Sequence, residues 1–372
     1  MLVEDLQLIG YRSYEALRVG FAAGPQLIVG PNAAGKTNLL EAIALLGSGH
    51  SHRASADSEL IAWSADFARL EAGVRDDNGS INRLELVLLR AGAGGRRRFK
   101  VNGVPRRASA LRASLPLVLF APEDMLLIIG SPSLRRQALD TLVAQLQPAA
   151  AATFSTYSRA LTQRNNLLRA IRDGLAARGE LTYWDDVVCG EGGRIVAWRL
   201  QLLADLSAPV ANAHAEIAPG EGQLCLRYIS NHQPADGESP QQALSRRLEE
   251  TSEKELWNGA TLVGPHRDDF SFELGAREMA GVASRGQQRS AILAFKLAEL
   301  ELLHARDGRQ PLLLLDDVFS ELDPQRRAHL VRRIGELPQA FVSTTTLDDL
   351  DPALVSASTA WRVSPGRLDR AA

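Results

Sequence analysis

One eight-residue segment limits the fold of this chain more than any other feature. Residues 30–37 read Gly-Pro-Asn-Ala-Ala-Gly-Lys-Thr, which matches the G-x-x-x-x-G-K-[ST] phosphate-loop pattern. Residues 26–29 before it have the pattern of a short buried strand, and an amphipathic helix is predicted from about Thr37. Because a working phosphate loop lies between such a strand and such a helix, the context favours an α/β nucleotide-binding domain over a chance match.

Each part of the loop has a predicted role in binding phosphate or Mg²⁺. Its backbone N–H groups are expected to turn inward around phosphate, at a helix N-terminus that carries partial positive charge. Lys36 is expected to reach the β- and γ-phosphates and assist catalysis, and Thr37 to hold Mg²⁺ through its hydroxyl. The predicted cofactors are therefore ATP and Mg²⁺. The predicted nucleotide-binding residues are Gly30, Pro31, Asn32, Ala33, Ala34, Gly35, Lys36, Thr37 and Asn38.

A second segment supplies the carboxylates that such a site needs. Residues 312–315 are four leucines followed by Asp316 and Asp317, which predicts a buried strand with acids at its carboxyl end. Ligands of open α/β sheets bind at that end. Asp316 is predicted to bind Mg²⁺, and Asp317 to orient or deprotonate the attacking water as a catalytic residue. The alternative is a solvated acidic loop, which is less favoured beside a good phosphate loop.

The distance between the two motifs predicts an inserted domain. Lys36 and Asp316 are 316 − 36 = 280 residues apart, more than a compact phosphate-loop ATPase needs. Helical spacing of leucine and alanine begins near Ser131, and α/β patterning returns near Asn258. We therefore predict a head built from residues 1–130 and 258–372 and a helical arm at 131–257. A break of one arm helix at Gly190–Gly193 is left open.

Two further segments have the order and spacing of ABC-type ATPase motifs. One heads a predicted helix and resembles the signature motif, which acts on ATP held by the opposite subunit; its residues are Ser284, Arg285, Gly286, Gln287 and Gln288. The other follows Asp317 as a D-loop would, and its residues are Ser320, Glu321, Leu322 and Asp323. The alternative is an ordinary capped helix followed by an ordinary loop.

The chain resembles the RecF family of bacterial recombination mediators from end to end. The segments that carry the resemblance, in chain order, are residues 37–43 (Thr-Asn-Leu-Leu-Glu-Ala-Ile), 120–124 (Phe-Ala-Pro-Glu-Asp), Arg135-Arg136 with Leu139-Asp140, Gln163-Arg164-Asn165, 264–269 (Gly-Pro-His-Arg-Asp-Asp) and 315–323 (Leu-Asp-Asp-Val-Phe-Ser-Glu-Leu-Asp). The resemblance implies an α/β fold, with an ABC-type P-loop ATPase head like that of SMC proteins and an inserted helical second lobe.

The same resemblance implies a function and partners. Members of this family are weak DNA-dependent ATPases that form a homodimer with ATP and bind duplex DNA near single-strand gaps. The implied partners are RecR, with RecO, RecA and single-strand-binding protein nearby. Two departures from ABC transporters suggest slow hydrolysis: Asp317 replaces their glutamate, and Ser343–Thr346 replace their switch histidine. A third departure is that Glu123 lies about where the Q-loop glutamine is expected, so the role of Glu123 is doubtful.

A basic segment is the main candidate for DNA contact, because the whole chain has a formal net charge of only -2. Asn102-Gly103 within it predicts a tight hairpin. The segment contains no acid between residues 90 and 107, and its cations are Arg90, Arg96, Arg97, Arg98, Lys100, Arg106 and Arg107. They are expected either to contact DNA phosphates or to form a solvated basic loop.

The remaining features concern location and competing functions. The two cysteines argue against a disulfide framework, and we find no signal peptide or membrane-length apolar run, so a cytoplasmic protein without membrane contact is expected. The roles of Arg12, Arg53 and His266 stay open. The competing hypotheses are an ABC transporter ATPase subunit and a repair scaffold that does not hydrolyse ATP.

Overall fold

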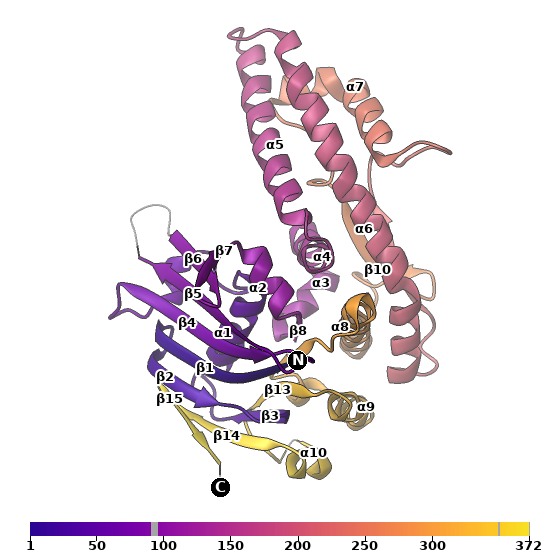
Figure 1. The fold of residues 1–372 in the computed structure, drawn as a ribbon. Helices are drawn as coiled ribbons and strands as arrows, with labels where there is room; N and C mark the ends of the chain where they lie inside the picture. Colours follow the sequence, from indigo (N-terminus) through magenta and orange to yellow (C-terminus); the bar gives the residue numbers. More distant parts are fainter. Residues whose placement is uncertain (91–95, 349, 372) are drawn as a thin grey trace. The chain divides into compact units, whose positions relative to one another are not determined.

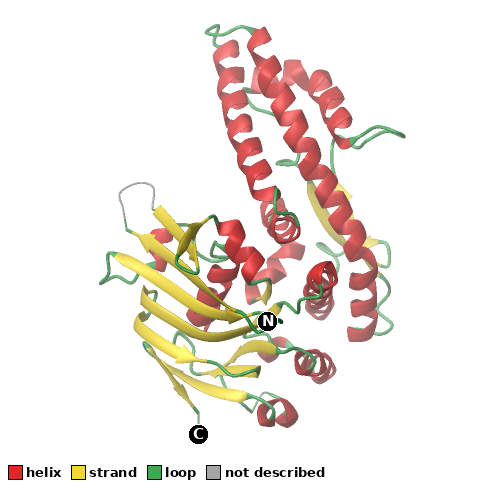
Figure 2. Ribbon diagram, in the orientation of Figure 1, coloured by secondary structure: helices red, strands yellow, loops and turns green. Residues whose placement is uncertain are grey.

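The computed structural model describes residues 1–90, 96–348 and 350–371, and only the backbone of Arg96 and Glu321. The chain forms two compact units (Figures 1 and 2). The first contains residues 1–125, 212–221 and 285–372, and the second contains residues 126–211 and 222–284. Each unit has its own core of buried hydrophobic side chains.

The first unit is built on two six-stranded sheets. One is an antiparallel sheet in the order β2-β1-β4-β5-β6-β7; its strands are β1 (Leu2–Tyr11), β2 (Tyr14–Gly20), β4 (Phe67–Arg75), β5 (Ile81–Leu89), β6 (Arg96–Val101) and β7 (Val104–Arg106). The other is mainly parallel, in the order β15-β14-β3-β13-β12-β8; its strands are β3 (Gly24–Val29), β8 (Leu117–Phe120), β12 (Leu312–Asp316), β13 (Gln339–Thr344), β14 (Thr359–Ser364) and β15 (Arg367–Arg370).

Helix α1 (Lys36–Ser48) connects the cores of these two sheets. It contacts β4 and β5 of the antiparallel sheet and β8, β12 and β13 of the parallel sheet. Its side chains from Leu39 to Leu46 are buried almost without exception, because apolar residues surround the helix on both faces. Helix α1, which begins at Lys36 of the phosphate loop, is therefore fixed between the two sheets.

The parallel sheet brings the two predicted nucleotide motifs together. Strand β13 lies between β3 and β12 and pairs with both in parallel register. The carboxyl ends of the three strands therefore lie at one edge, where Val29 leads into the phosphate loop and Asp316 ends β12. The order of strands, and not their spacing in the sequence, makes them neighbours.

Shorter elements and the two longer helices α8 and α9 complete the first unit. The 3-10 helix η2 (Pro122–Met125) follows β8, and α8 packs against both. The other elements are η1 (Asp57–Leu60), α2 (Ala108–Ser114), α8 (Arg285–Asp307), η4 (Phe319–Glu321), α9 (Pro324–Gly335) and α10 (Pro352–Ser356). Leucine, isoleucine and alanine bury the inner face of α8 against the sheet.

The second unit combines long helices with a small antiparallel sheet in the order β11-β10-β9. Its core gathers side chains of α5, α6 and α7. Its elements are α3 (Leu126–Ile129), α4 (Pro132–Leu146), α5 (Ala150–Arg172), η3 (Arg178–Glu180), most of α6 (Leu181–Ile217), β9 (Leu224–Ile229), α7 (Pro240–Asn258), β10 (Asp269–Leu274) and β11 (Arg277–Glu278).

The contacts of the chain divide it differently from the boundaries that we expected at 130/131 and 257/258. Residues 258–284 join the second unit, because β10 pairs along its whole length with β9 of that unit. Residues 212–221, which include the end of α6, join the first unit. The boundary expected at 257/258 is therefore displaced by pairing between strands that are distant in the sequence, which sequence spacing does not record.

Helix α6 is continuous through Gly190–Gly193, so the break left open there does not occur. The glycines instead allow close packing of another helix. A Cβ at Gly193 would lie 2.7 Å from the Cα of Gln241, and one at Gly192 would lie 2.8 Å from a methyl group of Leu244. Both neighbours belong to α7, which therefore approaches α6 at backbone distance. Among the helices described, none is long and apolar enough to cross a membrane.

Candidate nucleotide site

The phosphate loop has the backbone that its sequence requires. Residues 30–35 connect β3 to α1, and Ala33 and Gly35 have left-handed φ angles of 64° and 114°. A Cβ at Gly35 would also lie 3.0 Å from Ser13 Oγ and 3.1 Å from the Tyr14 hydroxyl, which donates to the Gly35 carbonyl. Glycine is needed at this position for both φ and space.

Lys36 is the first residue of α1, and its ammonium group lies inside the loop. Its Nζ donates to the carbonyls of Gly30 at 2.7 Å and Pro31 at 3.0 Å. Burial lowers the pKa of Lys36, and the charges of Asp317 and Asp316 oppose that shift. The lysine therefore lies where phosphate oxygens could replace the two carbonyls as its acceptors.

The two residues predicted to hold Mg²⁺ are in contact. Thr37 Oγ1 donates to Asp316 Oδ1 at 3.1 Å, although the residues are 279 positions apart. Asp316 is only 3% exposed and also accepts from Ser343 Oγ at 2.6 Å. A hydroxyl and a carboxylate beside a phosphate loop are the hard oxygen ligands that Mg²⁺ prefers. The predicted pair therefore fits the ion.

Ser343 has a role that the sequence did not reveal. Its hydroxyl donates to Asp316 and accepts from the backbone N–H of Asp317 at 3.0 Å. Asp317 itself has a left-handed φ of 50°, a strained backbone for a residue other than glycine. Ser343, in the segment that replaces a switch histidine, thus fixes the turn that carries both acids. Its pairing with Asp316 in β13–β12 register was the missing information.

A small pocket adjoins Asp317, the predicted catalytic residue. It is lined by Phe120, Pro122, Met125, Arg289, Asp316, Asp317, Val318 and Leu322. Its walls therefore come from the end of β8, from η2, from α8 and from the segment after β12. The expected Q-loop region thus borders the site through Pro122 and Met125.

Glu123, the residue at the expected Q-loop position, does not line that pocket. Its side chain is 51% exposed and lies 3.8 Å from Arg53. The neighbouring Asp124 is the engaged residue: it accepts from the Ala121 N–H at 2.8 Å and pairs with buried Lys296 at 3.1 Å. Lys296 of α8 also pairs with Glu299 at 3.4 Å, and burial raises the pKa of Glu299 to about 7.

Arg12 is a structural residue of the first unit and does not extend towards solvent as a free cation. Its guanidinium makes two hydrogen bonds to buried Glu41, at 2.9 and 2.8 Å, and a third to the Glu59 carbonyl. Ser51 donates to the same carboxylate at 2.5 Å. These donors keep the pKa of Glu41 below its usual range although burial acts to raise it. Arg12 therefore fixes the turn between β1 and β2 against α1.

The D-loop and signature segments lie where the sequence placed them along the chain. Ser320 Oγ donates to the Asp317 carbonyl at 3.0 Å, and Asp323 caps α9 by accepting from the Arg326 N–H at 3.0 Å. Helix α8 begins at Arg285, so Ser284 immediately precedes its first residue. Ser290 of α8 donates to the Gly286 carbonyl at 3.1 Å. The roles of both segments across a dimer are tested by no contact within one chain.

Comparison with known proteins decides the family. The family model described as RecF/RecN/SMC N terminal domain matches residues 2–360. The DNA replication and repair protein RecF of Bacillus subtilis (strain 168) is 38% identical over 377 residues, which cover 99% of this chain and 100% of that protein. RecF of Herpetosiphon aurantiacus is also 38% identical, over 386 residues that cover 99% of each chain.

The chain belongs to the RecF family. A solved structure described as the recombination mediator protein RecF-ATP in the RecFOR pathway superimposes with a TM-score of 0.90 at 28% identity, covering 100% of this chain and 97% of that one. An SMC head bound to the C-winged helix domain of ScpA gives 0.55 at 18% identity, covering 100% and 98%. The ABC-type ATPase head that the sequence predicted is therefore confirmed as the fold of the RecF-family chain.

The basic segment forms the predicted hairpin. Asn102 and Gly103 have φ angles of 52° and 77°, as a two-residue turn of this type requires, and they join β6 to β7. Arg97 pairs with Asp57 and Lys100 pairs with Glu85 at 2.9 Å, so acids from other segments neutralise these two cations. Arg90 donates to the Ala62 carbonyl at 3.0 Å.

Three other cations of the hairpin region remain available. Arg98, Arg106 and Arg107 are exposed, and within the described part of the chain no acid pairs with them. The side chain of Arg96 lies outside the described residues. The DNA-contact hypothesis for this RecF-family chain therefore rests on a smaller set of arginines than the sequence suggested.

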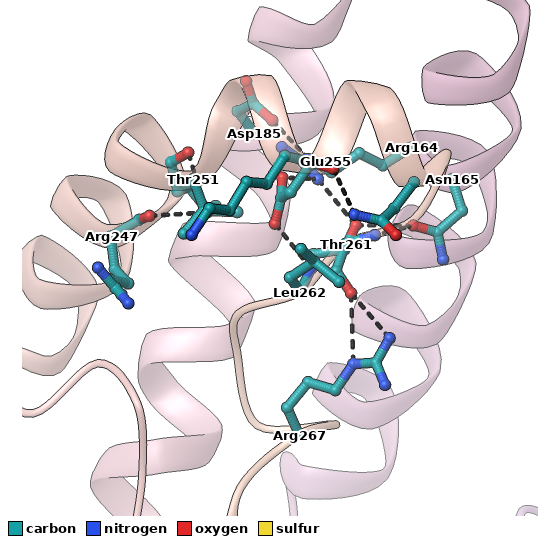
Figure 3. A network of polar contacts seen from close by, with 12 residues as sticks. Arg164, Asn165, Asp185, Arg247, Thr251, Glu255, Thr261, Leu262 and Arg267 are labelled. Carbon is teal, nitrogen blue, oxygen red and sulfur yellow. Dashed lines mark hydrogen bonds and ion pairs between the residues drawn. The ribbon is translucent and has the colours of Figure 1, made fainter. Parts of the chain in front are cut away.

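Arg164 and Asn165 of the Gln163-Arg164-Asn165 segment are part of a polar network in the second unit (Figure 3). Arg164, nearly inaccessible on α5, pairs with Glu255 at 2.7 Å and with Asp185 at 2.6 Å. Asn165 Oδ1 accepts from both the N–H and the hydroxyl of Thr261 at 2.7 Å. The network thus joins α5, α6, α7 and the segment that leads to Gly264, so its members stabilise the unit.

The hydrogen bonds described for residues 264–269 are also made inside the second unit. His266 Nδ1 lies 2.7 Å from the Tyr157 hydroxyl and Nε2 lies 3.2 Å from the Thr261 carbonyl. Because a carbonyl only accepts, Nε2 carries the proton and Tyr157 donates to Nδ1. Burial lowers the pKa of His266 to about 4. The role of His266, which the sequence left open, is therefore structural: its neutral ring links Tyr157 to Thr261.

The two aspartates of the same segment hold other elements. Buried Asp268 accepts from the Tyr228 hydroxyl at 2.6 Å and lies 3.0 Å from His232 Nε2. Asp269 receives two hydrogen bonds from Arg135, at 2.7 and 2.6 Å. The two aspartates of this segment therefore hold elements of the second unit together.

Proposed function

We propose that this chain binds ATP with Mg²⁺ between its phosphate loop and Asp316, and that it hydrolyses ATP slowly. The observation that carries this proposal is the 3.1 Å hydrogen bond between Thr37, in the first turn of α1, and Asp316, at the carboxyl end of β12. The RecF structure described as ATP-bound supports it, because that chain shares this fold over its whole length.

The residues of the site divide the chemistry among them. Lys36 would exchange the carbonyls of Gly30 and Pro31 for β- and γ-phosphate oxygens. Mg²⁺, when held by Thr37 and Asp316, would neutralise charge that develops on the phosphates. Asp317 would orient the attacking water or accept its proton. Because the aspartate is shorter than the glutamate of transporters, and Ser343 holds the turn in place of a histidine, we expect slow turnover.

We further propose that ATP drives formation of a homodimer on duplex DNA near single-strand gaps, and that hydrolysis resets it. The cytoplasmic, DNA-associated protein would act with RecR, with RecO, RecA and single-strand-binding protein nearby. Two observations support this: the RecF relatives match over the full length, and the segment that resembles an ABC-type signature motif lies at the start of α8. The full-length match to DNA repair proteins also favours this function over a transporter subunit.

The experiment that tests the proposal measures ATP binding, dimerisation and turnover with and without gapped duplex DNA. Lys36→Met should cripple ATP binding, since the cation facing the phosphates is lost. Asp317→Asn should still bind ATP and keep the dimer longer while hydrolysis falls by about 100-fold, the size typical of losing one positioned base. Normal ATP affinity of the Lys36 variant would refute the site. A parental protein that binds ATP without any turnover would indicate the scaffold instead.

A further inference from the structure

The side chain of Arg326 contacts three different segments of the first unit. The roles proposed for the nucleotide site do not explain these contacts. It lies on the first turn of α9 and is 16% exposed. Its Nε donates to Ser290 Oγ at 2.8 Å, one terminal nitrogen pairs with Asp323, and the other pairs with Glu221 at 3.0 Å. A planar guanidinium with five donors suits such a junction, and a lysine ammonium does not.

Of these partners, Asp323 belongs to the predicted D-loop, and Ser290 lies on α8 two residues after the predicted signature segment. Ser290 is fully buried, and its hydroxyl donates to the carbonyl of Gly286 in the first turn of α8. Arg326 is thereby linked to the start of that helix. Asp323 is the last residue of the D-loop and caps α9 with its other oxygen. Arg326 therefore fixes the spacing between the signature helix and the D-loop.

The third partner lies at the end of the longest helix. Helix α6 covers 37 residues, most of them in the second unit, and its last residues 212–217 belong to the first unit. Glu221 follows four residues later and is anchored to the helix end by a hydrogen bond from its N–H to the Ala218 carbonyl at 3.2 Å. His329 of α9 lies 3.9 Å from Glu216 in the same region. The end of α6 is thus held by α9.

We propose that Arg326 is a positioning residue that holds the signature helix, the D-loop and the end of α6 in one arrangement, so that ATP-dependent dimerisation depends on the position of α6. This inference rests on the proposed function, because signature and D-loop act only across a dimer. Among the hydrogen bonds and ion pairs described for the Arg326 side chain, none is made with the phosphate loop. Loss of Arg326 should therefore separate ATP binding, which is retained, from dimerisation, which is lost.

The test compares Arg326→Gln, Arg326→Lys and Glu221→Gln with the control Arg333→Gln. Arg333 is a cation of the same helix whose ion pairs with Glu301 and Glu336 lie near the surface, at 3.8 and 3.5 Å. The readouts are ATP affinity, the dimer dissociation constant with ATP, and amide exchange of residues 286–290 and 320–325. Melting temperatures show whether each variant is folded.

Arg326→Gln should keep ATP affinity within about twofold and weaken the dimer about tenfold or more, the effect of one charge-assisted hydrogen bond. Amide exchange should rise in both segments. Arg326→Lys should recover part of each loss, and Glu221→Gln should weaken the dimer less. A double variant that combines Arg326→Gln with Glu221→Gln should be no worse than Arg326→Gln, because the pair acts as a unit. Arg333→Gln should match the parent.

Unchanged dimerisation and unchanged amide exchange in Arg326→Gln would overturn the inference. If that variant does not fold, Arg326→Lys and Glu221→Gln decide by the same readouts. If the parent forms no dimer with ATP, the proposed function fails, and amide exchange alone then decides whether Arg326 holds the two segments together.

Discussion

At the scale of single residues, burial and ion pairing decide which ionisable side chains are charged. Burial lowers the pKa of His266 to about 4 and keeps its ring neutral, although the hydrogen bond to the Thr261 carbonyl acts to raise that pKa. Arg164 and Glu255 are buried as a pair instead, with the guanidinium shared by Asp185. In the same unit, a buried histidine whose described hydrogen bonds involve no acid is thus neutral, whereas a buried arginine between two acids is charged.

The neutral His266 predicts a pH dependence of stability. Its folded pKa of about 4 lies below the ordinary value of 6.5, so the unfolded chain binds the proton more tightly between these two pH values. The stabilisation is complete above pH 6.5 and is lost as the pH falls towards 4, by roughly 3 kcal/mol in all. Urea unfolding at several pH values measures it.

His266→Asn is the matched variant for this prediction, because its carbonyl oxygen can still accept from Tyr157. It should be less stable at pH 7 and should lose less stability than the parent between pH 6.5 and 4.5. Equal pH slopes in the two proteins would show that His266 is not the group responsible.

At the scale of elements, the β6–β7 hairpin shows why a charge run is not yet a binding surface. Acids of other segments have already neutralised Arg97 and Lys100, whereas Arg98, Arg106 and Arg107 are exposed. A phosphate contact releases counterions only where the cation is free to make it. The available cations, and not the total, determine the electrostatic contribution to DNA binding.

A salt titration of duplex binding distinguishes the two groups of cations. Replacing Arg98, Arg106 and Arg107 together with glutamine should lower the slope of log affinity against log salt by up to about three units, roughly one for each contact. Arg97→Gln should lower it much less, and neither change should affect ATP affinity. A triple variant with the parental slope would return the hairpin to the status of a solvated loop.

At the scale of the whole molecule, the proposed dimer requires that each nucleotide be shared by two chains. Ser284 immediately precedes α8, so Ser284→Arg would place bulk where the partner's γ-phosphate is expected. ATP binding to the monomer should remain near normal, while the ATP-dependent dimer and DNA-stimulated hydrolysis should be lost. A symmetric dimer contains two equivalent sites.

Mixing Ser284→Arg with Lys36→Met gives the decisive comparison. In their heterodimer one composite site carries both lesions and the other carries neither, so ATP hydrolysis should return to about half the parental level if the motifs act in trans. A heterodimer that demonstrably forms but stays inactive would show that Ser284 does not act on the partner's nucleotide.

The sequence by itself determined the local parts of the nucleotide site. The strand, loop and helix around Lys36, the strand that ends at Asp316 and the Asn102-Gly103 turn follow from patterns within a few residues, and the structure contains each of them. Periodicity and turn chemistry act over short distances, so a single segment carries the whole signal. Family motifs extended this to the fold.

Only the tertiary structure decided which distant residues meet. Ser343 joins Asp316 because β13 lies beside β12, residues 258–284 join the helical unit because β10 pairs with β9, and Gly192–Gly193 pack α7 where the sequence allowed a break. Arg326 likewise serves three segments that lie up to 105 residues away from it. Strand order, register and shared side-chain partners arise from burial of the whole chain, which no local pattern encodes.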